Sequence, residues 1–436
     1  MILLYDPFRK LPCKLSPCRR FFASHPAAHT ATDFAHHKKT ARLNHGSFGA
    51  TPLPVLEAQD EFRRQWLAQP DEMYFSGELH ERMRQAAIAG ATTLSPSTTL
   101  CTDEICLLEN ATVATCAVAY HWSKMIQPGD VIVYLDVAYR ACIHILKEYC
   151  ERVGAKLVPL TIPFPATAEQ EILSSLRAQL ESLVERKLKP KFAFLDHVSS
   201  QPSILLPIAA IIRLVRQYGD GAHNRRVQVC VDAAHAVGSV QNMDITQYDC
   251  DYYYSNLHKW GFAPPTASIF WARYATEMRH PITSWAWGQG LAADALFTGT
   301  RDYSAMAAVP VAVDYLRSWR SSDGQTSSQY CHRRVLEAAQ FLRNEWGTSH
   351  LDSDTEDSLV ATQAMVRLPT DLHVTDRPGQ VTRGVRDRLR DDYNIEASVG
   401  CFGSKGNYLR LSWAVYTTNN DIERLAKAVI DITESQ

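Results

Sequence analysis

The chain has 436 residues, of which 46% are hydrophobic and 21% are charged. This composition is typical of a globular protein with a sizeable core, and the length predicts two or three domains. The 45 basic and 47 acidic side chains nearly cancel, which argues against nucleic acid or an anionic membrane as the main partner. A small molecule or another protein is the favoured partner.

Two further classes of protein are excluded by the sequence. The longest apolar runs, such as residues 208–212, are far shorter than the roughly 20 residues that span a bilayer. The eleven cysteines show no CxxC pair and no zinc-like spacing with histidine, and an odd number does not suggest a disulfide framework. We therefore expect no membrane span, no bound metal and a reducing compartment.

The first forty residues differ from the rest, because their basic side chains are opposed only by Asp6 and Asp33. This composition is typical of a mitochondrial presequence, but Pro12, Pro17 and Pro26 would interrupt an amphipathic helix. We favour a disordered or loosely docked extension, and a cytoplasmic location with the mitochondrion as the alternative.

The predicted elements alternate between strands and helices from about residue 100. Short runs rich in β-branched residues are separated by segments of helical period. Such an order predicts a mainly parallel sheet with helices on both faces. The expected strands are residues 103–108, 131–135, 156–161, 191–195, 227–231, 252–255 and 267–271, and the expected long helices are residues 138–153, 169–186 and 207–219.

The order of the elements changes after about residue 310, which predicts a small α/β domain with an antiparallel sheet. The polar stretches 321–328 and 348–358 are expected to be loops. The expected elements are a helix over 334–346, a strand over 362–368, a helix over 381–391, strands over 395–399 and 408–413, and a helix over 421–433.

Functional groups of a parallel sheet gather at the carboxyl ends of its strands. The predicted strand 227–231 runs directly into Asp232, and His258 and Lys259 follow strand 252–255. A carboxylate at the end of a buried strand is costly unless a cation pairs with it. Taken alone, Asp232 and Lys259 fit a structural ion pair as well as a catalytic site.

Pyridoxal 5'-phosphate gives this pair a more specific explanation. The cofactor needs a lysine amine for its covalent attachment and an acid that keeps its pyridine nitrogen protonated. Lys259 and Asp232 supply these two groups. His235 follows three residues after Asp232 and is placed to reach the phenolic oxygen of the ring. Without the other two residues, it would be interpreted as a core histidine.

The cofactor phosphate needs backbone N–H groups at the N-terminus of a helix. Asn110, Ala111 and Thr112 lie where strand 103–108 ends and the helical segment ATVATCAVAYHW begins. Asn110 or Thr112 would also serve as an ordinary N-cap. The two roles are compatible, because a capped helix start is what binds phosphate.

The chain resembles the class V, cysteine desulfurase-like branch of fold-type I pyridoxal phosphate enzymes, and within it the isopenicillin N epimerase-like group. The resemblance implies an α/β fold in which a large domain has a mainly parallel seven-stranded sheet and a small α/β domain lies at the C-terminus. It covers nearly the whole chain after residue 40. The matching segments are LNHGSFGATP (43–52), YLDVAYRA (134–141), FLDHVSSQP (194–202), VDAAHAVG (231–238), SNLHKWGFAP (255–264), FTGTRDYSA (297–305) and YLRLSW (408–413).

The resemblance also implies a domain organisation. Residues 1–40 would be an extension and residues 41–65 a segment at the active site. Residues 66–310 would form the large cofactor-binding domain and residues 311–436 the small domain.

The matching residues take their expected roles from the resemblance. Lys259 would bind the cofactor covalently and move protons, Asp232 would pair with the pyridine nitrogen, and His235 would bind the phenolic oxygen. Tyr139 would stack on the ring. The other cofactor-binding residues would be Ala111, Thr112, Ser199, Asn256, His258 and Thr300, of which Thr300 would reach the phosphate of a neighbouring subunit. Such a shared site implies a homodimer.

The substrate is expected to be an amino acid. Arg410 matches the arginine that binds the substrate α-carboxylate, a task suited to a planar guanidinium. A surface ion pair at a strand edge is the alternative for Arg410. Asn44 and His45 would form part of the substrate pocket near the dimer seam, where Gly46 and Gly49 fit a tight turn.

Transamination, racemisation and elimination share the loss of the Cα proton, so the motifs identify the cofactor better than the reaction. The epimerase-like group includes eukaryotic cysteine desulfhydrases and the lyase that acts on hercynylcysteine sulfoxide in ergothioneine biosynthesis. We therefore expect a C–S lyase acting on cysteine or a cysteine S-conjugate or sulfoxide, with Tyr139 or His45 as the acid.

Other reactions remain open. An epimerase or aminotransferase is the first alternative, and a desulfurase using Cys401 as its nucleophile is the second; otherwise Cys401 is an ordinary thiol. A catalytically silent member of the family is disfavoured, because both Lys259 and Asp232 are present.

Overall fold

The computed structural model describes residues 33–36, 39–166, 168–219, 226–348, 356–369, 372 and 384–435. Most of the expected N-terminal extension, including the stretch considered as a presequence, lies outside these residues. Within the described part of the chain, no helix is both long and apolar enough to cross a membrane.

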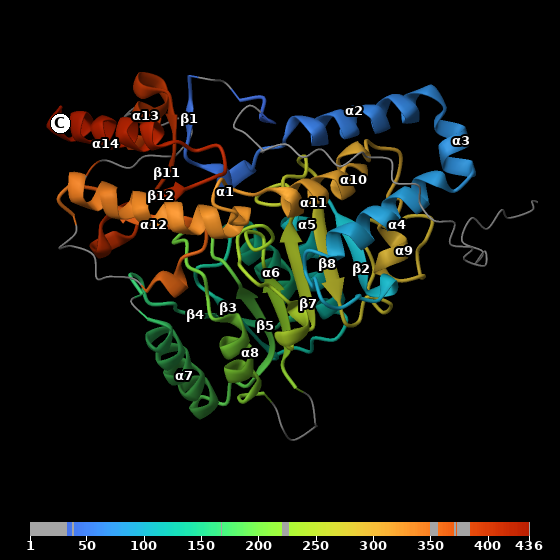
Figure 1. Ribbon diagram of the computed structural model, residues 1–436. Helices are drawn as coiled ribbons and strands as arrows, with labels where there is room; N and C mark the ends of the chain where they lie inside the picture. Colours follow the sequence, from blue (N-terminus) through green and yellow to red (C-terminus); the bar gives the residue numbers. More distant parts are fainter. Residues whose placement is uncertain are drawn as a thin grey trace, which may run out of the picture.

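A seven-stranded, mainly parallel sheet forms the centre of the large domain, as the sequence predicts (Figure 1). Its strand order is β2-β8-β7-β6-β5-β3-β4, and β8 alone runs antiparallel to its neighbours. The predicted strand 103–108 starts late, because Thr102–Glu104 forms a 3-10 turn. The bounds are β2 Ile105–Leu108, β3 Val131–Leu135, β4 Lys156–Leu160, β5 Pro190–Asp196, β6 Gln228–Asp232, β7 Tyr252–Asn256 and β8 Ser268–Ala272.

Helices cover both faces of this sheet because the central strands are apolar on both sides. On β5, for example, Phe192 and Phe194 face α5 (Ala111–Ser123) and α6 (Arg140–Val153). The alternate residues of the strands belong to the larger core on the other face. The helices there are α4 (Glu78–Ala91), α7 (Glu169–Glu185), α8 (Ile208–Arg216) and α11 (Val309–Ser318).

The described N-terminal segment joins the two domains. β1 (Ala41–Arg42) pairs with β10 of the small domain, and Leu43 packs in the small-domain core. The short helix α1 (His45–Phe48) then enters the large domain (Figure 1). The helices α2 (Leu53–Ala68), α3 (Pro70–Phe75), α9 (Leu291–Asp294) and α10 (Ser304–Ala307) complete that domain.

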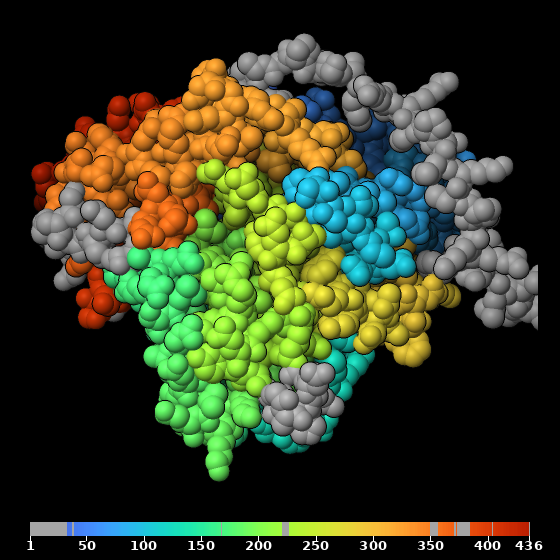
Figure 2. Space-filling view, turned by 60° about the horizontal axis from the view of Figure 1, so that its bottom comes forward, coloured from blue at the N-terminus to red at the C-terminus, as the bar shows by residue number. Residues whose placement is uncertain are grey.

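The small domain has its own core around an antiparallel sheet of order β11-β12-β9. The orange surface around its first helix, α12, borders the green and yellow surface of the large domain (Figure 2). The elements are α12 (Ser327–Glu345), β9 (Gln363–Arg367), α13 (Val385–Tyr393), β10 (Ile395–Glu396), β11 (Ser398–Cys401), β12 (Asn407–Ser412) and α14 (Asn419–Glu434).

Three predictions about this region differ from the structure. The predicted strand 395–399 is divided at Ala397, because β10 pairs with β1 while β11 pairs with β12. The helix predicted from residue 334 begins at Ser327, where Thr326 and Gln329 form a capping box, so the polar stretch 321–328 is not entirely a loop. The apolar side chains of α11 pack in the larger core, so the small-domain core begins with α12 rather than at residue 311.

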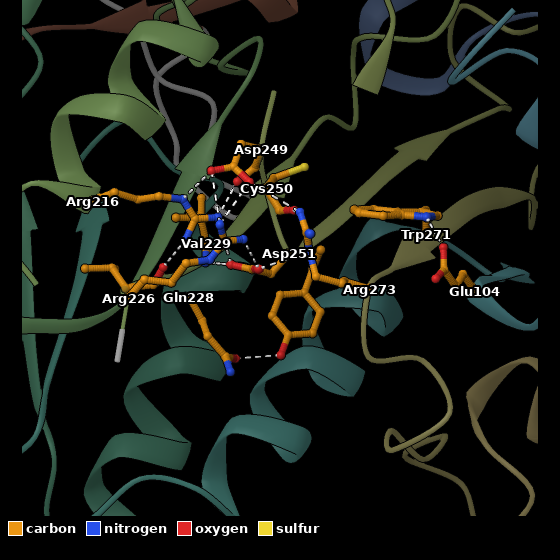
Figure 3. Close-up of polar contacts among 12 residues, drawn as sticks. Glu104, Arg216, Arg226, Gln228, Val229, Asp249, Cys250, Asp251, Trp271 and Arg273 are labelled. Carbon is orange, nitrogen blue, oxygen red and sulfur yellow. Dashed lines mark hydrogen bonds and ion pairs between the residues drawn. The ribbon is translucent and has the colours of Figure 1, made fainter. Parts of the chain in front are cut away.

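A charged cluster holds the amino-terminal edge of the sheet together (Figure 3). Asp251, which is fully buried just before β7, accepts a hydrogen bond from the Val229 N–H at 2.8 Å. Its carboxylate also contacts Arg216 of α8 at 3.1 Å, Arg226 at 2.9 Å and Arg273 at 3.5 Å. This cluster lies at the opposite edge of the sheet from Asp232 and Asn256, which end their strands.

Candidate active site

Lys259 lies in the turn after β7 and lines a cavity of about 300 Å³ at the carboxyl ends of the strands. Its Nζ is 3.0 Å from Nε2 of His235. Burial lowers the pKa of Lys259 to about 8, although the negative charge of Asp232 acts in the opposite direction. The amine is therefore far easier to deprotonate than that of an exposed lysine.

Asp232 is the last residue of β6 and lines the same cavity. It accepts hydrogen bonds from the Ala234 N–H at 2.9 Å and from the Cys142 thiol at 3.5 Å. Burial raises its pKa, while the Ala234 N–H and the Lys259 cation lower it. A buried carboxylate of this kind is suited to pairing with a cationic ring nitrogen.

The N-terminus of α5 forms one wall of the cavity through Asn110, Ala111 and Thr112. Asn110 caps the helix by accepting from the Val113 N–H at 3.1 Å, and Asn256 accepts from the Ala111 N–H at 2.9 Å. Within the described residues, no acceptor takes up the Thr112 N–H. This helix start therefore offers a donor and the positive end of a helix dipole to an anion.

His258 lies on the cavity wall next to Lys259. Its Nδ1 is 3.1 Å from the carbonyl oxygen of Ala267 and donates to it, since a carbonyl can only accept. Burial, together with the charge of Lys259, lowers the pKa of His258 to about 4. The ring is neutral at physiological pH.

The N-terminal segment closes the cavity with Gly46, Ser47 and Phe48 of α1. Gly49 ends this helix with φ +68°, and a Cβ there would lie 1.8 Å from the carbonyl oxygen of His258. Glycine is therefore required for the segment to pass so close to the turn that carries Lys259.

Arg410 of β12 reaches the same region from the small domain. Its Nη1 donates to the Ser200 carbonyl oxygen at 2.9 Å and to the Ser200 hydroxyl at 3.2 Å. Its Nη2 donates to Asn44 Oδ1 at 2.8 Å and to the Ser47 hydroxyl at 2.7 Å. Burial lowers the pKa of Arg410 to about 10, so its guanidinium remains a cation at physiological pH. Ser47 and Ser200 line the cavity, which places this cation at its edge.

Tyr139 also lines the cavity and is 55% exposed, at the start of α6. The side chain is therefore accessible to solvent. That Tyr139 stacks on the cofactor ring or serves as the acid stays a prediction.

His45 is not among the residues that line the cavity, and its expected role as acid or substrate contact stays a prediction. Its ring is buried beside Trp260, at 4.5 Å between centroids, and its Nδ1 is 2.9 Å from the Tyr416 hydroxyl. Burial lowers its pKa to about 3, so the ring is neutral at physiological pH and keeps a single N–H. The neighbouring Gly46 and Ser47 face the cavity instead.

Other expected residues also lie outside the cavity lining, among them Asn44, which bonds to Arg410 at the cavity edge. Ser199 is buried, and its hydroxyl donates to the Pro202 carbonyl oxygen at 2.6 Å, so it stabilises the turn while Ser200 faces the cavity. Thr300 is exposed and does not line the cavity of its own chain. Cys401 is exposed at the end of β11, three residues beyond Ser398, the strand partner of Arg410.

Sequence reasoning missed several residues of the site, among them Ser47, Asp196 and Gln363. Asp196 ends β5 beside Asp232 of β6, lines the cavity, and has a buried Oδ2 without a hydrogen-bond partner among the described residues. The sequence held a signal for Asp196, because it follows the predicted strand 191–195 just as Asp232 follows the predicted strand 227–231. Gln363 of β9 contacts His235, and no sequence pattern predicts this contact between the two domains.

The residues present fit pyridoxal 5'-phosphate. The cavity wall combines an amine, a buried carboxylate and a helix N-terminus, which match the aldehyde, pyridine nitrogen and phosphate of the cofactor. This donor set is specific, because a structural ion pair would need neither the open helix start nor the cavity.

Comparison with known proteins identifies the class first and then the family. A cysteine desulfurase from Thermococcus onnurineus NA1 has a similar structure, with a TM-score of 0.70 and 15% identity over 93% of this chain and 98% of that chain. The predicted fold, fold-type I, is confirmed. The aminotransferase class-V family model matches residues 49–340, so the chain belongs to this family. The expected cofactor, pyridoxal 5'-phosphate, is confirmed by this membership.

Curated relatives extend the comparison over nearly the whole chain. The L-cysteine desulfhydrase of Arabidopsis thaliana is 32% identical over 93% of this chain and 90% of its own length. The hercynylcysteine sulfoxide lyase of Schizosaccharomyces pombe is 23% identical, with coverages of 89% and 93%. The isopenicillin N epimerase of Streptomyces clavuligerus is 25% identical, with coverages of 90% and 94%. The resemblance expected from the sequence motifs is confirmed.

Proposed function

We propose that the protein is a pyridoxal phosphate-dependent C–S lyase, which eliminates the β-substituent of cysteine or of a cysteine S-conjugate or sulfoxide such as hercynylcysteine sulfoxide. The observation that carries this proposal is the cavity shared by Lys259, Asp232 and the start of α5, with Arg410 at its edge. The similarity to a desulfhydrase over 93% of the chain supports the reaction, and the similarity to a sulfoxide lyase supports the wider substrate range.

The cofactor supplies an electron sink that weakens the bonds at the substrate Cα. Lys259 would hold it covalently and move the Cα proton through Nζ, and Asp232 would keep its ring nitrogen protonated. Arg410 would bind the substrate carboxylate together with Asn44. Tyr139 would stack on the ring, and Tyr139 or His45 would serve as the acid. The phosphate would be held by Ala111, Thr112, Asn256 and His258.

Elimination requires no protein nucleophile, which favours a lyase over a desulfurase. Cys401 lies outside the cavity lining, so nothing places its thiol against a substrate sulfur held near Arg410. An epimerase or aminotransferase is the alternative, supported by the similarity to isopenicillin N epimerase. An epimerase and an aminotransferase would each use the same Lys259 and Asp232.

We also propose a homodimer in which Thr300 reaches the phosphate in the partner's cavity. Large apolar side chains at the cavity rim are exposed, with Phe48 at 74% and Tyr139 at 55%. Thr300 is itself exposed, in the chain segment between α9 and α10. Exposed apolar surface next to a site is typical of an interface.

For the compartment, we propose the cytoplasm, because the nine cysteines of the described part of the chain are all free. The mitochondrion is the alternative, and a chloroplastic relative exists.

Imaging fluorescent fusions of the full chain and of a chain without residues 1–40 tests the compartment. Loss of an organellar signal on removal of the segment would contradict the cytoplasmic proposal.

One experiment tests both the cofactor attachment and the reaction. Borohydride reduction of the holoenzyme and peptide mapping should place the pyridoxyl group on Lys259. Incubation with cysteine, S-substituted cysteines and their sulfoxides should give pyruvate and ammonia in equal amounts. Alanine with an enzyme-bound persulfide would identify a desulfurase, and a label on another lysine would overturn the site.

A further inference from the structure

Gln363 connects the small domain to the cofactor site. It is fully buried on β9, and its side-chain Nε2 is 3.3 Å from Nδ1 of His235 in the large domain. Its Oε1 accepts from the hydroxyl of Ser412 at 3.4 Å, and Ser412 is its cross-strand partner on β12. The far nitrogen of the same histidine, Nε2, is 3.0 Å from Nζ of Lys259.

The orientation of the Gln363 amide gives these hydrogen bonds their direction, with Oε1 toward Ser412 and Nε2 toward His235. The backbone N–H of Gly46, which can only donate, contacts the Ser412 hydroxyl oxygen at 3.4 Å. The Ser412 hydroxyl donates to Gln363 Oε1, which turns the amide NH₂ group toward His235. Because an amide NH₂ group only donates, Nδ1 of His235 accepts. The ring proton of the neutral imidazole then lies on Nε2 when the Lys259 amine is deprotonated or bound to the cofactor, since an ammonium group at 3.0 Å would itself donate to Nε2.

His235 is neutral in this environment. It is buried, and burial, followed by the charges of Lys259, Arg410 and His258, lowers its pKa well below the usual range. Lys259 and His258 face it from the turn after β7, and Arg410 faces it from β12. A neutral ring has one N–H, so the position of that proton decides what Nε2 can do.

We propose that Gln363 is a positioning residue that fixes His235 as an N–H donor at Nε2, toward the cofactor. This inference rests on the proposed function, in which His235 binds the phenolic oxygen of pyridoxal phosphate. An N–H at Nε2 stabilises negative charge on that oxygen, whereas the other tautomer would present a lone pair to it. Arg410 lies two residues before Ser412 on β12, so one strand pair carries both the substrate-binding arginine and the support of His235.

The tautomer is measured in the apoprotein, without any activity, at about pH 9.5, where the Lys259 amine is neutral and accepts from Nε2. In ¹⁵N NMR spectra of histidine-labelled protein, the His235 signals are assigned by their absence from His235→Gln. We expect a protonated Nε2 and an unprotonated Nδ1 in the wild type, and a mixture of tautomers in Gln363→Met. A protonated Nδ1 in the wild type would overturn the inference.

The second measurement is the pH titration of the visible spectrum of the holoenzyme. When a hydrogen bond is donated to the phenolic oxygen, the negative charge on that oxygen is dispersed and the oxygen holds the neighbouring proton less tightly. Loss of the donor therefore raises the pH at the midpoint of the spectral titration. Gln363→Met should raise it by about 0.5 to 1 pH unit, the size of one net hydrogen bond. Ser412→Ala, which frees the amide to rotate, should act in the same direction by less.

A double-mutant cycle separates positioning from general damage to the fold. Gln363→Met should have no additional effect on the midpoint in a His235→Gln background, since it acts only through His235. The matched control is Gln340→Met, because Gln340 is an exposed glutamine of the same domain whose side chain, among the described residues, bonds to Asn344 at 3.1 Å. It should leave the midpoint unchanged.

The outcomes distinguish this inference from the proposed function. If His235→Gln shifts the midpoint and Gln363→Met does not, the inference is wrong and the cofactor site stands. If borohydride does not fix the cofactor on Lys259, the proposed function fails, while the tautomer in the apoprotein still tests the role of Gln363.

Discussion

Burial determines the chemistry of Lys259 at the scale of single residues. An exposed lysine has a pKa near 10.4, whereas desolvation lowers that of Lys259 to about 8. Only the neutral amine is nucleophilic. We therefore predict that the rate of cofactor capture by the apoprotein rises with pH and levels off above about pH 8. Stopped-flow absorbance measures this rate, and a rate still rising through pH 10 would contradict the prediction.

Asp232→Asn tests how the neighbouring carboxylate affects the pKa of Lys259. The carboxylate raises the pKa of Lys259, so its removal should move the midpoint of cofactor capture to lower pH. Turnover should also be largely lost, because the ring nitrogen would no longer be held protonated. Near-normal turnover by this variant would count against Asp232 as the partner of the ring.

Arg410→Lys should weaken substrate use at least tenfold in kcat/KM while leaving the cofactor spectrum intact. The guanidinium makes four hydrogen bonds, through Nη1 and Nη2, that fix its plane. The ammonium group of lysine keeps the charge but cannot donate two parallel hydrogen bonds from one plane. We expect this loss to weaken transition-state binding by about 1–2 kcal/mol or more. Cys401→Ala, the control, should keep elimination nearly unchanged. Loss of turnover in Cys401→Ala would revive the desulfurase alternative.

Asp196→Asn should stabilise the apoprotein at neutral pH. Burial raises the pKa of Asp196 well above its usual value, and Asp232 adds to this. The folded state therefore binds the proton more tightly than the unfolded state, whose pKa is about 3.9, so stability is lost as the pH rises above that value. We expect a gain of about 1–3 kcal/mol at pH 8 that shrinks toward pH 4.

Calorimetry at the two pH values measures this gain. The exposed Asp314 of α11 is the control, because Asp314→Asn should change little at either pH. An equal gain at both pH values would show that the charge of Asp196 is not the cause.

At the scale of secondary structure elements, strand ends were predictable and contacts between elements were not. The strand Val131–Leu135 was predicted to the residue, because its apolar run is bounded by polar residues. Asp232 and Lys259 were predicted because one ends a strand and the other lies in the turn after a strand. The start of α12 was missed although Thr326 and Gln329 have capping-box spacing, since the surrounding polar residues suggested a loop.

The cluster around Asp251 predicts which element contacts stabilise the sheet (Figure 3). Asp251 joins the end of α8 to the residues flanking β6 and β8 through three arginines. Asp251→Asn should lower the free energy of unfolding by about 2–4 kcal/mol, because it leaves the largely buried Arg216 underneutralised while the more exposed arginines remain screened.

Asp249→Asn is the matched control for this cluster. Asp249 contacts the same arginines but its side chain is 52% exposed, so its loss should cost less than about 1 kcal/mol. Urea unfolding measures both variants. Cofactor absorbance should be unchanged in each, since the cluster lies at the edge of the sheet away from Lys259. Equal effects of the two substitutions would contradict the importance of burial.

At the scale of the whole molecule, the site depends on contacts that sequence neighbours do not reveal. His45 and Ser47 are two residues apart, yet one packs on Trp260 and the other bonds to Arg410 from β12. The motif LNHGSFG identifies the segment but not which side chain faces the cavity, because that choice is made by packing between the domains. Gln363 was missed for the same reason.

The proposed homodimer gives the last prediction, because Thr300 and Lys259 would then serve the same site from different chains. Lys259→Ala and Thr300→Asp should each be nearly inactive, the second because a carboxylate repels the cofactor phosphate. When the two variants are unfolded together and refolded in equal amounts, half of the dimers should be mixed and each should contain one intact site. The mixture should recover about a quarter of wild-type activity, as expected from a two-fold symmetric pair with shared sites. If refolding of wild-type chains alone succeeds and the mixture stays inactive, Thr300 does not enter the partner's site.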